Sequence, residues 1–195
     1  MRYHNITKDD MLNGDGLRAV LWLSGCEHKC KNCQNPITWD ICGGLLFDEA
    51  AKEELFEALE PDYISGITFS GGDPLHIQNR EEVGRLIEEI HNKFPEKTIW
   101  VYTGYLWKDV KELWFMKYVD VLVDGPFVEE LKDVTLHWKG SSNQRVINAK
   151  DTLKYYPSSD VVILHTSDKE PMTIQIIDEH ADLIYATSGY ADIIK

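Results

Sequence analysis

Short apolar runs alternate with amphipathic stretches along most of the chain. Each run has the length of a buried strand and is followed by turn residues such as glycine, serine, proline or aspartate. The runs predict strands at residues 19–23, 64–69, 98–102, 119–123 and 161–164. The later runs 173–177 and 183–186 fit strands and buried helix segments equally well, because periodicity does not separate the two in short segments.

Two stretches between these runs predict amphipathic helices that cover a sheet. Asp48 is a favourable helix cap, apolar residues recur at four-residue steps after it, and Pro61 ends the pattern. The clearest helix runs from about residue 79 to residue 93, with its apolar residues on one stripe. The positions expected to face the sheet are Ala51, Leu55, Leu59, Val83, Leu86, Ile87, Ile90 and Phe94.

Two weaker helix patterns follow, one with Val110, Leu113 and Trp114 inward and one around residues 146–155. Strands separated by helices favour right-handed crossovers and a parallel sheet. Four strand-helix units are too few for a full barrel of about 250 residues. We therefore expect one α/β domain over all 195 residues, an open, partial parallel β/α barrel, in which residues 155–195 form an extension of unassigned role.

Four segments rich in glycine or polar residues directly follow predicted strands. They are residues 24–36, 70–74, 103–105 and 124–126. The carboxyl ends of parallel strands meet at one edge of a sheet, where α/β enzymes place their active sites. The pattern alone therefore predicts that these four segments form one site.

Composition narrows the range of partners. The chain has 33 acidic and 20 basic residues and a formal charge of -13, which disfavours binding to nucleic acid or to anionic membranes. No apolar run approaches a membrane span, and the first residues lack the apolar core of a signal peptide. We therefore expect a cytoplasmic protein.

Three of the four cysteines, Cys26, Cys30 and Cys33, lie in a C-x3-C-x2-C pattern. Clustered thiolates select soft metal centres, and three of them can hold a [4Fe-4S] cluster while leaving one iron open to a ligand. The alternative is a structural zinc or fully ligated cluster with Cys42 or His28 as fourth ligand. Otherwise Cys42 is expected to be a free or buried thiol.

Two glycine-containing turns need separate readings. Gly71 and Gly72 follow a predicted strand, where adjacent glycines let the backbone approach a ligand closely, although a tight turn needs them as well. Residues 13–16 lack the Lys-Ser/Thr of a phosphate-binding loop and are read as a simple turn.

The cysteine pattern resembles that of radical S-adenosylmethionine (radical SAM) enzymes. Most of these enzymes carry an aromatic residue before the last cysteine, where this chain has Asn32. A small residue there is typical of the activating enzymes of the anaerobic (class III) ribonucleotide reductase, which the chain resembles over about residues 1–150. The motifs that carry this resemblance are Tyr3-His4, Asn13-Gly14, Arg18, Ser24-Gly25-Cys26, Thr38-Trp39, residues 70–75, 99–101, 103–105 and 121–125, and Gly140 to Gln144.

The resemblance implies two cofactors, a [4Fe-4S] cluster and S-adenosyl-L-methionine. It also implies the role of each site residue, with no side chain acting as acid or base. The cluster ligands would be Cys26, Cys30 and Cys33; the backbone of Asn32 and Gln34 would flank S-adenosyl-L-methionine; Gly71, Gly72 and Asp73 would bind its methionyl end; and Thr103 and Asn143 would complete the pocket. Longer activating enzymes carry a lysine near the place of Pro126, so contacts to the methionyl carboxylate are not assigned.

The implied activity is reductive cleavage of S-adenosyl-L-methionine to methionine and a 5′-deoxyadenosyl radical. That radical would remove a hydrogen atom from a glycine of the large subunit of the anaerobic ribonucleotide reductase, and a flavodoxin-like protein would supply the electron. Two other readings stay open. One is a small-molecule radical SAM enzyme similar to 7-carboxy-7-deazaguanine synthase, and the other is a non-enzymatic metal-binding or electron-transfer protein.

Overall fold

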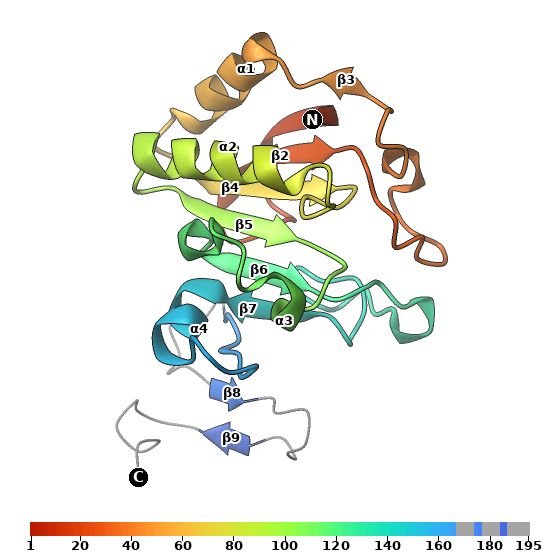
Figure 1. Ribbon diagram of the computed structural model, residues 1–195, viewed down its shortest axis with the longest axis vertical. Coiled ribbons are helices and arrows are strands. Elements are labelled where there is room, and N and C mark those ends of the chain that lie inside the picture. Colours follow the sequence, from red (N-terminus) through yellow and green to blue (C-terminus); the bar gives the residue numbers. More distant parts are fainter. Residues whose placement is uncertain (167–173, 177–183, 187–195) are drawn as a thin grey trace.

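A seven-stranded mixed sheet forms the centre of the protein (Figure 1). The computed structural model describes residues 1–166, 174–176 and 184–186. Across the sheet the strands follow the order β3-β1-β2-β4-β5-β6-β7. They are β1 (Arg2–Asp10), β2 (Leu17–Leu23), β3 (Leu45–Leu46), β4 (Ile64–Gly71), β5 (Thr98–Tyr102), β6 (Val121–Asp124) and β7 (Arg145–Asn148).

The four middle strands are parallel, as the sequence predicts. β2 pairs with β4, β4 with β5, and β5 with β6, all in parallel. The outer strands β1, β3 and β7 are antiparallel to their neighbours, which the expectation of a parallel sheet missed. β1 escaped prediction because only Tyr3 and Ile6 of its nine residues are buried, so it lacks a continuous apolar run. The run at residues 19–23 is consequently the second strand and not the first.

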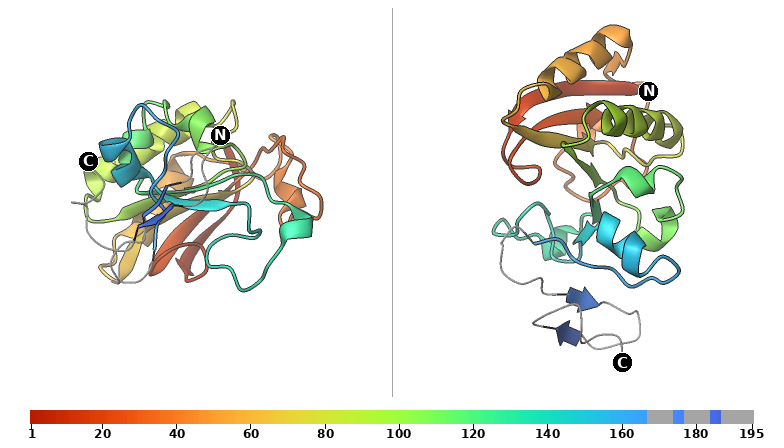
Figure 2. Two further views of the ribbon diagram at one scale, coloured as in Figure 1. Left: turned by 90° about the horizontal axis from the view of Figure 1, so that it is seen from below. Right: turned by 90° about the vertical axis from the view of Figure 1, so that its left-hand side faces the viewer.

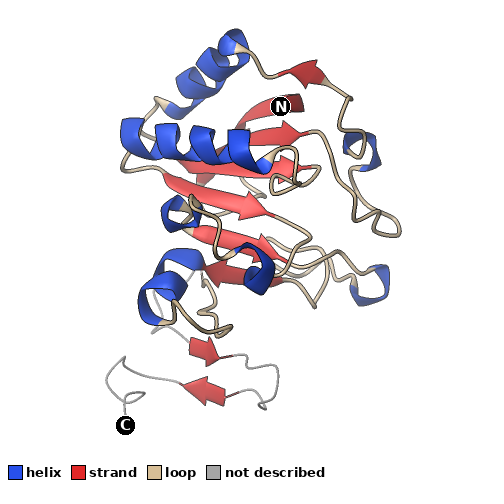
Figure 3. Cartoon of the chain, viewed as in Figure 1, coloured by secondary structure: helices blue, strands red, loops and turns tan. Residues whose placement is uncertain are grey.

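The helices lie on one side of the sheet, and the first three of them lie in the connections between parallel strands (Figures 2 and 3). Helix α1 begins where expected, because the Asp48 side chain accepts a hydrogen bond from the Ala51 amide. The apolar stripe of α2 is buried as predicted, at Val83, Leu86, Ile87 and Ile90. The helices are α1 (Glu49–Leu59), α2 (Arg80–Lys93), α3 (Trp107–Val110) and α4 (Ala149–Tyr155), with short 3-10 turns η1 (Pro36–Thr38), η2 (Met116–Tyr118) and η3 (Glu129–Leu131).

Three local predictions were wrong. Residues 146–148 belong to β7, and the helix starts only at Ala149, because Val146 and Ile147 pair with β6. Helix α3 has only four residues, and Trp114 beyond it is 42% exposed instead of inward. Residues 161–164 form one isolated bridge, from Leu164 to Ile147, and no full strand.

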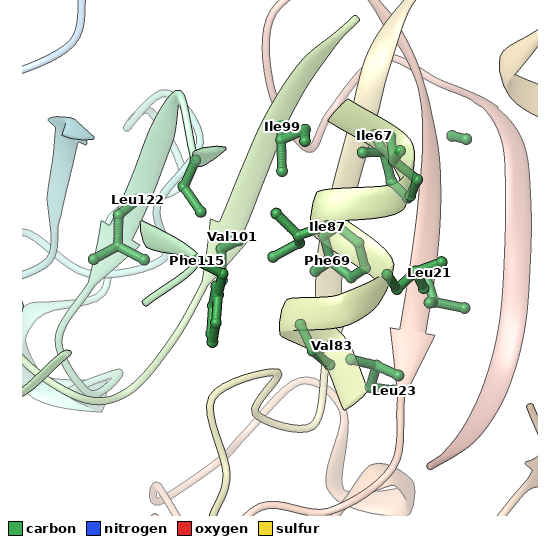
Figure 4. Packing of buried hydrophobic residues seen from close by; sticks show 14 of the residues in the cluster. Leu21, Leu23, Ile67, Phe69, Val83, Ile87, Ile99, Val101, Phe115 and Leu122 are labelled. Atoms are coloured by element: carbon green, nitrogen blue, oxygen red, sulfur yellow. The ribbon is translucent and has the colours of Figure 1, made fainter. Parts of the chain in front are cut away.

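Alternating residues of the sheet face two different surroundings. Leu21, Leu23, Ile67 and Phe69 point toward α2 and pack against its buried stripe (Figure 4). Strand neighbours point to opposite faces, so the intervening residues build a second, smaller cluster on the face away from the helices. That cluster consists of Trp100, Val121, Val123 and Val146, with Tyr102 and Trp138 packed against it.

Two short strands, β8 (Ile174–Ile176) and β9 (Ile184–Ala186), pair antiparallel with each other. The described residues of the two undecided runs are therefore strands, while residues 173, 177 and 183 lie outside the described part. Within that described part, no helix is both long enough and apolar enough to cross a membrane.

Candidate functional site

The loops after the parallel strands gather at one edge of the sheet, where the arrowheads of β2, β4, β5 and β6 point in Figure 1. A cavity of about 220 Å³ lies there. All four segments predicted from strand positions contribute to its wall. The wall includes Cys26, Cys30, Cys33 and Gln34 from the first, Ser70 to Asp73 from the second, Thr103 and Gly104 from the third, and Gly125 from the fourth.

The cysteine loop turns tightly enough to bring its three thiols to this cavity. Gly25, Lys29 and Asn32 have positive φ angles of 99°, 49° and 54°. Asparagine is one of the few residues other than glycine that adopt this left-handed backbone at low cost. The left-handed backbone at position 32 therefore explains an asparagine where most radical SAM enzymes carry an aromatic residue.

The donor set fits an iron-sulfur cluster better than a single zinc ion. In a four-iron cube each cysteine binds a different iron, so the sulfurs need not meet at one atom, whereas zinc requires four ligands around one ion. Among the described residues, no group of three or more His, Cys, Asp or Glu could hold one metal ion. Cys42 is exposed and does not line the cavity, and His28 is engaged by Asp73.

Burial raises the pKa of the Cys26 thiol to about 11. Without a metal this group is therefore protonated at neutral pH, and binding of a cluster would displace its proton. Cys26 is only partly exposed, so its thiol is partly shielded from solvent.

Gly71 and Gly72 are required by close packing of two strand ends. A Cβ on Gly71 would lie 2.7 Å from the Leu23 nitrogen, and one on Gly72 would lie 2.6 Å from the Gly25 oxygen. Gly71 also has a φ angle of 100°. The Gly72 amide donates to the Leu23 oxygen at 2.8 Å, so the glycine turn is held against the start of the cysteine loop.

The Asp73 side chain is buried and accepts hydrogen bonds from three segments. Its Oδ1 accepts from the Leu75 amide at 2.8 Å and from the Thr103 hydroxyl at 2.9 Å. Its Oδ2 accepts from the Gly104 amide at 3.0 Å and lies 2.6 Å from His28 Nε2. The carboxylate that the resemblance assigned to the methionyl end thus already binds four groups of the protein.

Comparison with known proteins identifies the family. A family model described as "4Fe-4S single cluster domain" matches residues 12–147. An "anaerobic ribonucleoside-triphosphate reductase-activating protein" of Enterobacteria phage T4 is 45% identical over 151 residues, which cover 77% of this chain and 96% of that protein. The chain belongs to this family. Proteins with the same name from Salmonella typhi and Escherichia coli (strain K12) are 42% and 41% identical over 150 residues, covering 75% of this chain and 97% of each relative.

All residues that line the cavity lie within residues 12–147, the part of this reductase-activating family member that matches the 4Fe-4S family model. Not every residue that the resemblance named lines it. Gln34 lies in the wall, but Asn32 is exposed and does not. Thr103 lies in the wall with its hydroxyl on Asp73, and Asn143 lies outside it and donates to the Pro126 oxygen.

The wall of this cavity also contains two buried polar atoms that the sequence did not indicate as ligand-binding groups. The Trp39 indole nitrogen and the Tyr102 hydroxyl are buried without a hydrogen-bond partner among the described residues. Burial also raises the pKa of Tyr102, which keeps the hydroxyl protonated and able to donate. Buried donors are rarely left unpaired, so these two atoms suit acceptors of a bound ligand. Trp39 belongs to the Thr38-Trp39 motif, whereas Tyr102 had no signal beyond its strand.

Proposed function

We propose that this chain is a radical SAM activase that cleaves S-adenosyl-L-methionine at a [4Fe-4S] cluster and generates a glycyl radical on the anaerobic ribonucleotide reductase. The observation that carries this proposal is the meeting of Cys26, Cys30 and Cys33 with the Gly71-Gly72 turn in one cavity. Family membership supports it, since the relatives are named as activating proteins of that reductase.

The proposal gives each group of residues in the cavity a separate role. Three cysteine thiolates would hold three irons and leave the fourth open, and the backbone of Gln34, Gly71 and Gly72 would face the ligand. When bound, the cluster and S-adenosyl-L-methionine supply the electron and the 5′-deoxyadenosyl radical. In the same proposal Asn32 acts through the shape of the cysteine loop, Asp73 and Thr103 through the arrangement of the wall, and Asn143 through its bond to Pro126.

The names of the relatives support the choice of substrate. We propose the large subunit of the anaerobic ribonucleotide reductase as partner and a flavodoxin-like protein as reductant, in the cytoplasm, where a reducing environment protects thiolate-bound clusters. The net charge of -13 argues against nucleic acid as partner. We further propose that the mixed sheet is the open, partial barrel of the radical SAM type and that residues 1–195 form one domain with an extension from residue 155.

The test is anaerobic. The protein is reconstituted with iron and sulfide, reduced with dithionite and mixed with S-adenosyl-L-methionine, and 5′-deoxyadenosine and methionine are quantified. Equimolar products are expected from the wild type and from Cys42→Ala, whose thiol is exposed outside the cavity, and none from Cys30→Ala. Adding the reductase large subunit should then give a glycyl radical signal in the electron paramagnetic resonance (EPR) spectrum. A cluster that never cleaves S-adenosyl-L-methionine would leave only an electron-transfer role.

A further inference from the structure

His28 lies inside the cysteine loop, between Cys26 and Cys30, and lines the same cavity as the three cysteines. Its side chain contacts the loops that follow β4 and β5. Its Nε2 is 2.6 Å from the buried Asp73 carboxylate. Its ring meets the Tyr105 ring edge to face at a centroid distance of 4.7 Å. It also covers Gly104, where a Cβ would lie 2.5 Å from the imidazole. Gly104 and Tyr105 both belong to the loop after β5.

The Asp73 carboxylate is a fixed anchor for this contact. Only 2% of its side chain is exposed, and the amides of Leu75 and Gly104 together with the Thr103 hydroxyl hold both oxygens. Because an ionised carboxylate only accepts hydrogen bonds, Nε2 of His28 must be the donor. Charge-assisted bonds of this kind are among the stronger hydrogen bonds in proteins.

The tip of the cysteine loop has few other supports among the described residues. Backbone bonds hold its base, where the Gly25 and Cys26 amides donate to the oxygens of Thr38 and Trp39. At the tip, Lys31 pairs with Glu130, and both side chains are more than 60% exposed. The Tyr105 hydroxyl also donates to the exposed Glu27 carboxylate at 2.7 Å. Exposed contacts of this kind contribute little. Among the described residues, the hydrogen bond from His28 to Asp73 is therefore the main buried side-chain contact between this tip and the loop that follows β4.

We infer that His28 is a positioning residue that ties the cysteine loop to Asp73 and thereby sets the cluster site against the glycine turn. The same carboxylate then serves the cysteine loop rather than binding the methionyl group through its side chain. This inference deepens the proposed function and rests on it, because it assigns His28 and Asp73 a part in aligning the two cofactors. The loop's thiols and residues 71–73 are held together before any cofactor binds.

Two substitutions at position 28 distinguish the hydrogen bond to Asp73 from the packing of the imidazole ring. Glutamine places its Nε2 the same number of bonds from Cα as histidine does, so His28→Gln can keep the bond to Asp73, while His28→Leu cannot. His91→Gln is a matched control, because His91 lies on α2 beside Tyr118 and away from the cavity. Circular dichroism of each variant checks that the fold is intact.

The first readout uses the apoprotein and needs no radical chemistry. Each variant is treated with iodoacetamide under reducing conditions, and mass spectrometry follows alkylation at Cys26 and Cys30, with exposed Cys42 as internal reference. We expect His28→Leu to raise the alkylation rate of the loop thiols by about tenfold, because local opening becomes easier. His28→Gln and His91→Gln should match the wild type. Equal rates in His28→Leu and the wild type, or equal acceleration in His28→Gln and His28→Leu, would overturn the inference.

The second readout uses the reconstituted protein. At equal iron content, His28→Leu should raise the KM for S-adenosyl-L-methionine by about tenfold and weaken the change that this ligand causes in the EPR spectrum of the reduced cluster. His28→Gln should restore both. Unchanged KM and spectra in His28→Leu would also overturn the inference. If the wild type fails to cleave S-adenosyl-L-methionine, the proposed function fails, and the alkylation rates still decide whether His28 holds the loop.

Discussion

Arg18 and Asp73 are buried charges at opposite ends of the same parallel strands. Arg18 lies near the start of β2, is fully buried, and donates all five of its N–H groups. Asp73 follows the end of β4 and accepts from four groups. The acceptors of Arg18 are Thr68 Oγ1, the Asp15 oxygen, the Ile67 oxygen, and both the hydroxyl and the carbonyl of Thr98.

The difference lies in what each charge joins. Arg18 binds mainly strand residues of β4 and β5 and stacks over Trp100 at 5.3 Å, so it fastens the sheet itself. Burial lowers its pKa to about 10, yet the side chain stays charged at neutral pH. Asp73 binds loops that line the cavity. Similar networks thus serve stability at one end of the strands and the arrangement of the site at the other.

The largest effect on stability is expected for Arg18→Met. It leaves buried carbonyl and hydroxyl oxygens without donors and should lower the free energy of unfolding by about 3–5 kcal/mol. Urea unfolding of the apoprotein followed by circular dichroism measures this. Arg85→Met is the control, because Arg85 is exposed on α2 and should change stability by less than about 0.5 kcal/mol. Similar losses of unfolding free energy in the two variants would show that the buried hydrogen bonds of Arg18 do not stabilise the sheet.

Asp73→Asn should have a smaller effect on stability and a larger one on activity. Both carboxylate oxygens accept from N–H groups, so an amide at position 73 would place its NH₂ against a donor whichever way it is turned. We expect a loss of about 2 kcal/mol in unfolding free energy and near-complete loss of 5′-deoxyadenosine formation. Urea unfolding and product chromatography on the same preparation give both values. Full activity in a destabilised variant would assign Asp73 to the fold alone.

Tyr102→Phe should separate ligand binding from stability. Its hydroxyl is buried and unpartnered among the described residues, so removing it should leave the unfolding free energy within about 1 kcal/mol of the wild type. The KM for S-adenosyl-L-methionine should rise by about tenfold if the hydroxyl donates to a bound cofactor. Tyr118→Phe is the control, since its hydroxyl binds Glu88 outside the cavity. An unchanged KM in Tyr102→Phe would contradict this role.

The smallest effect is expected for Lys31→Ala, which removes an ion pair with Glu130 at the tip of the cysteine loop. Both partners are largely exposed, so neither stability nor alkylation of Cys30 should change measurably. The assays described for His28 apply without modification. A change as large as that of His28→Leu would show that exposed contacts, and not the buried carboxylate, hold the loop.

The central parallel strands could be predicted from the sequence, whereas the outer strands β1 and β7 could not. The four parallel strands, the cap at Asp48 and the meeting of four loops follow from local patterns that the structure confirms. β1 has too few apolar residues to give a strand pattern, and residues 146–148 of β7 fit a helix pattern because they directly precede α4. In the site, the contact of His28 with Asp73 joins residues 45 positions apart, which no spacing rule reports. Unpaired donors such as Tyr102 become visible only when their neighbours are placed.

The two-residue strand β3 has a consequence for how the protein behaves at high concentration. β3 covers only Arg2 and Tyr3 of the long strand β1, with Leu45 and Leu46 exposed at the margin of the sheet. An open strand edge is a template for pairing with another chain. The other end of β1 carries Lys8, Asp9 and Asp10, and charges there oppose edge-to-edge association. Replacing these three residues by threonine or valine would therefore create an aggregation-prone edge far from the cysteine loop.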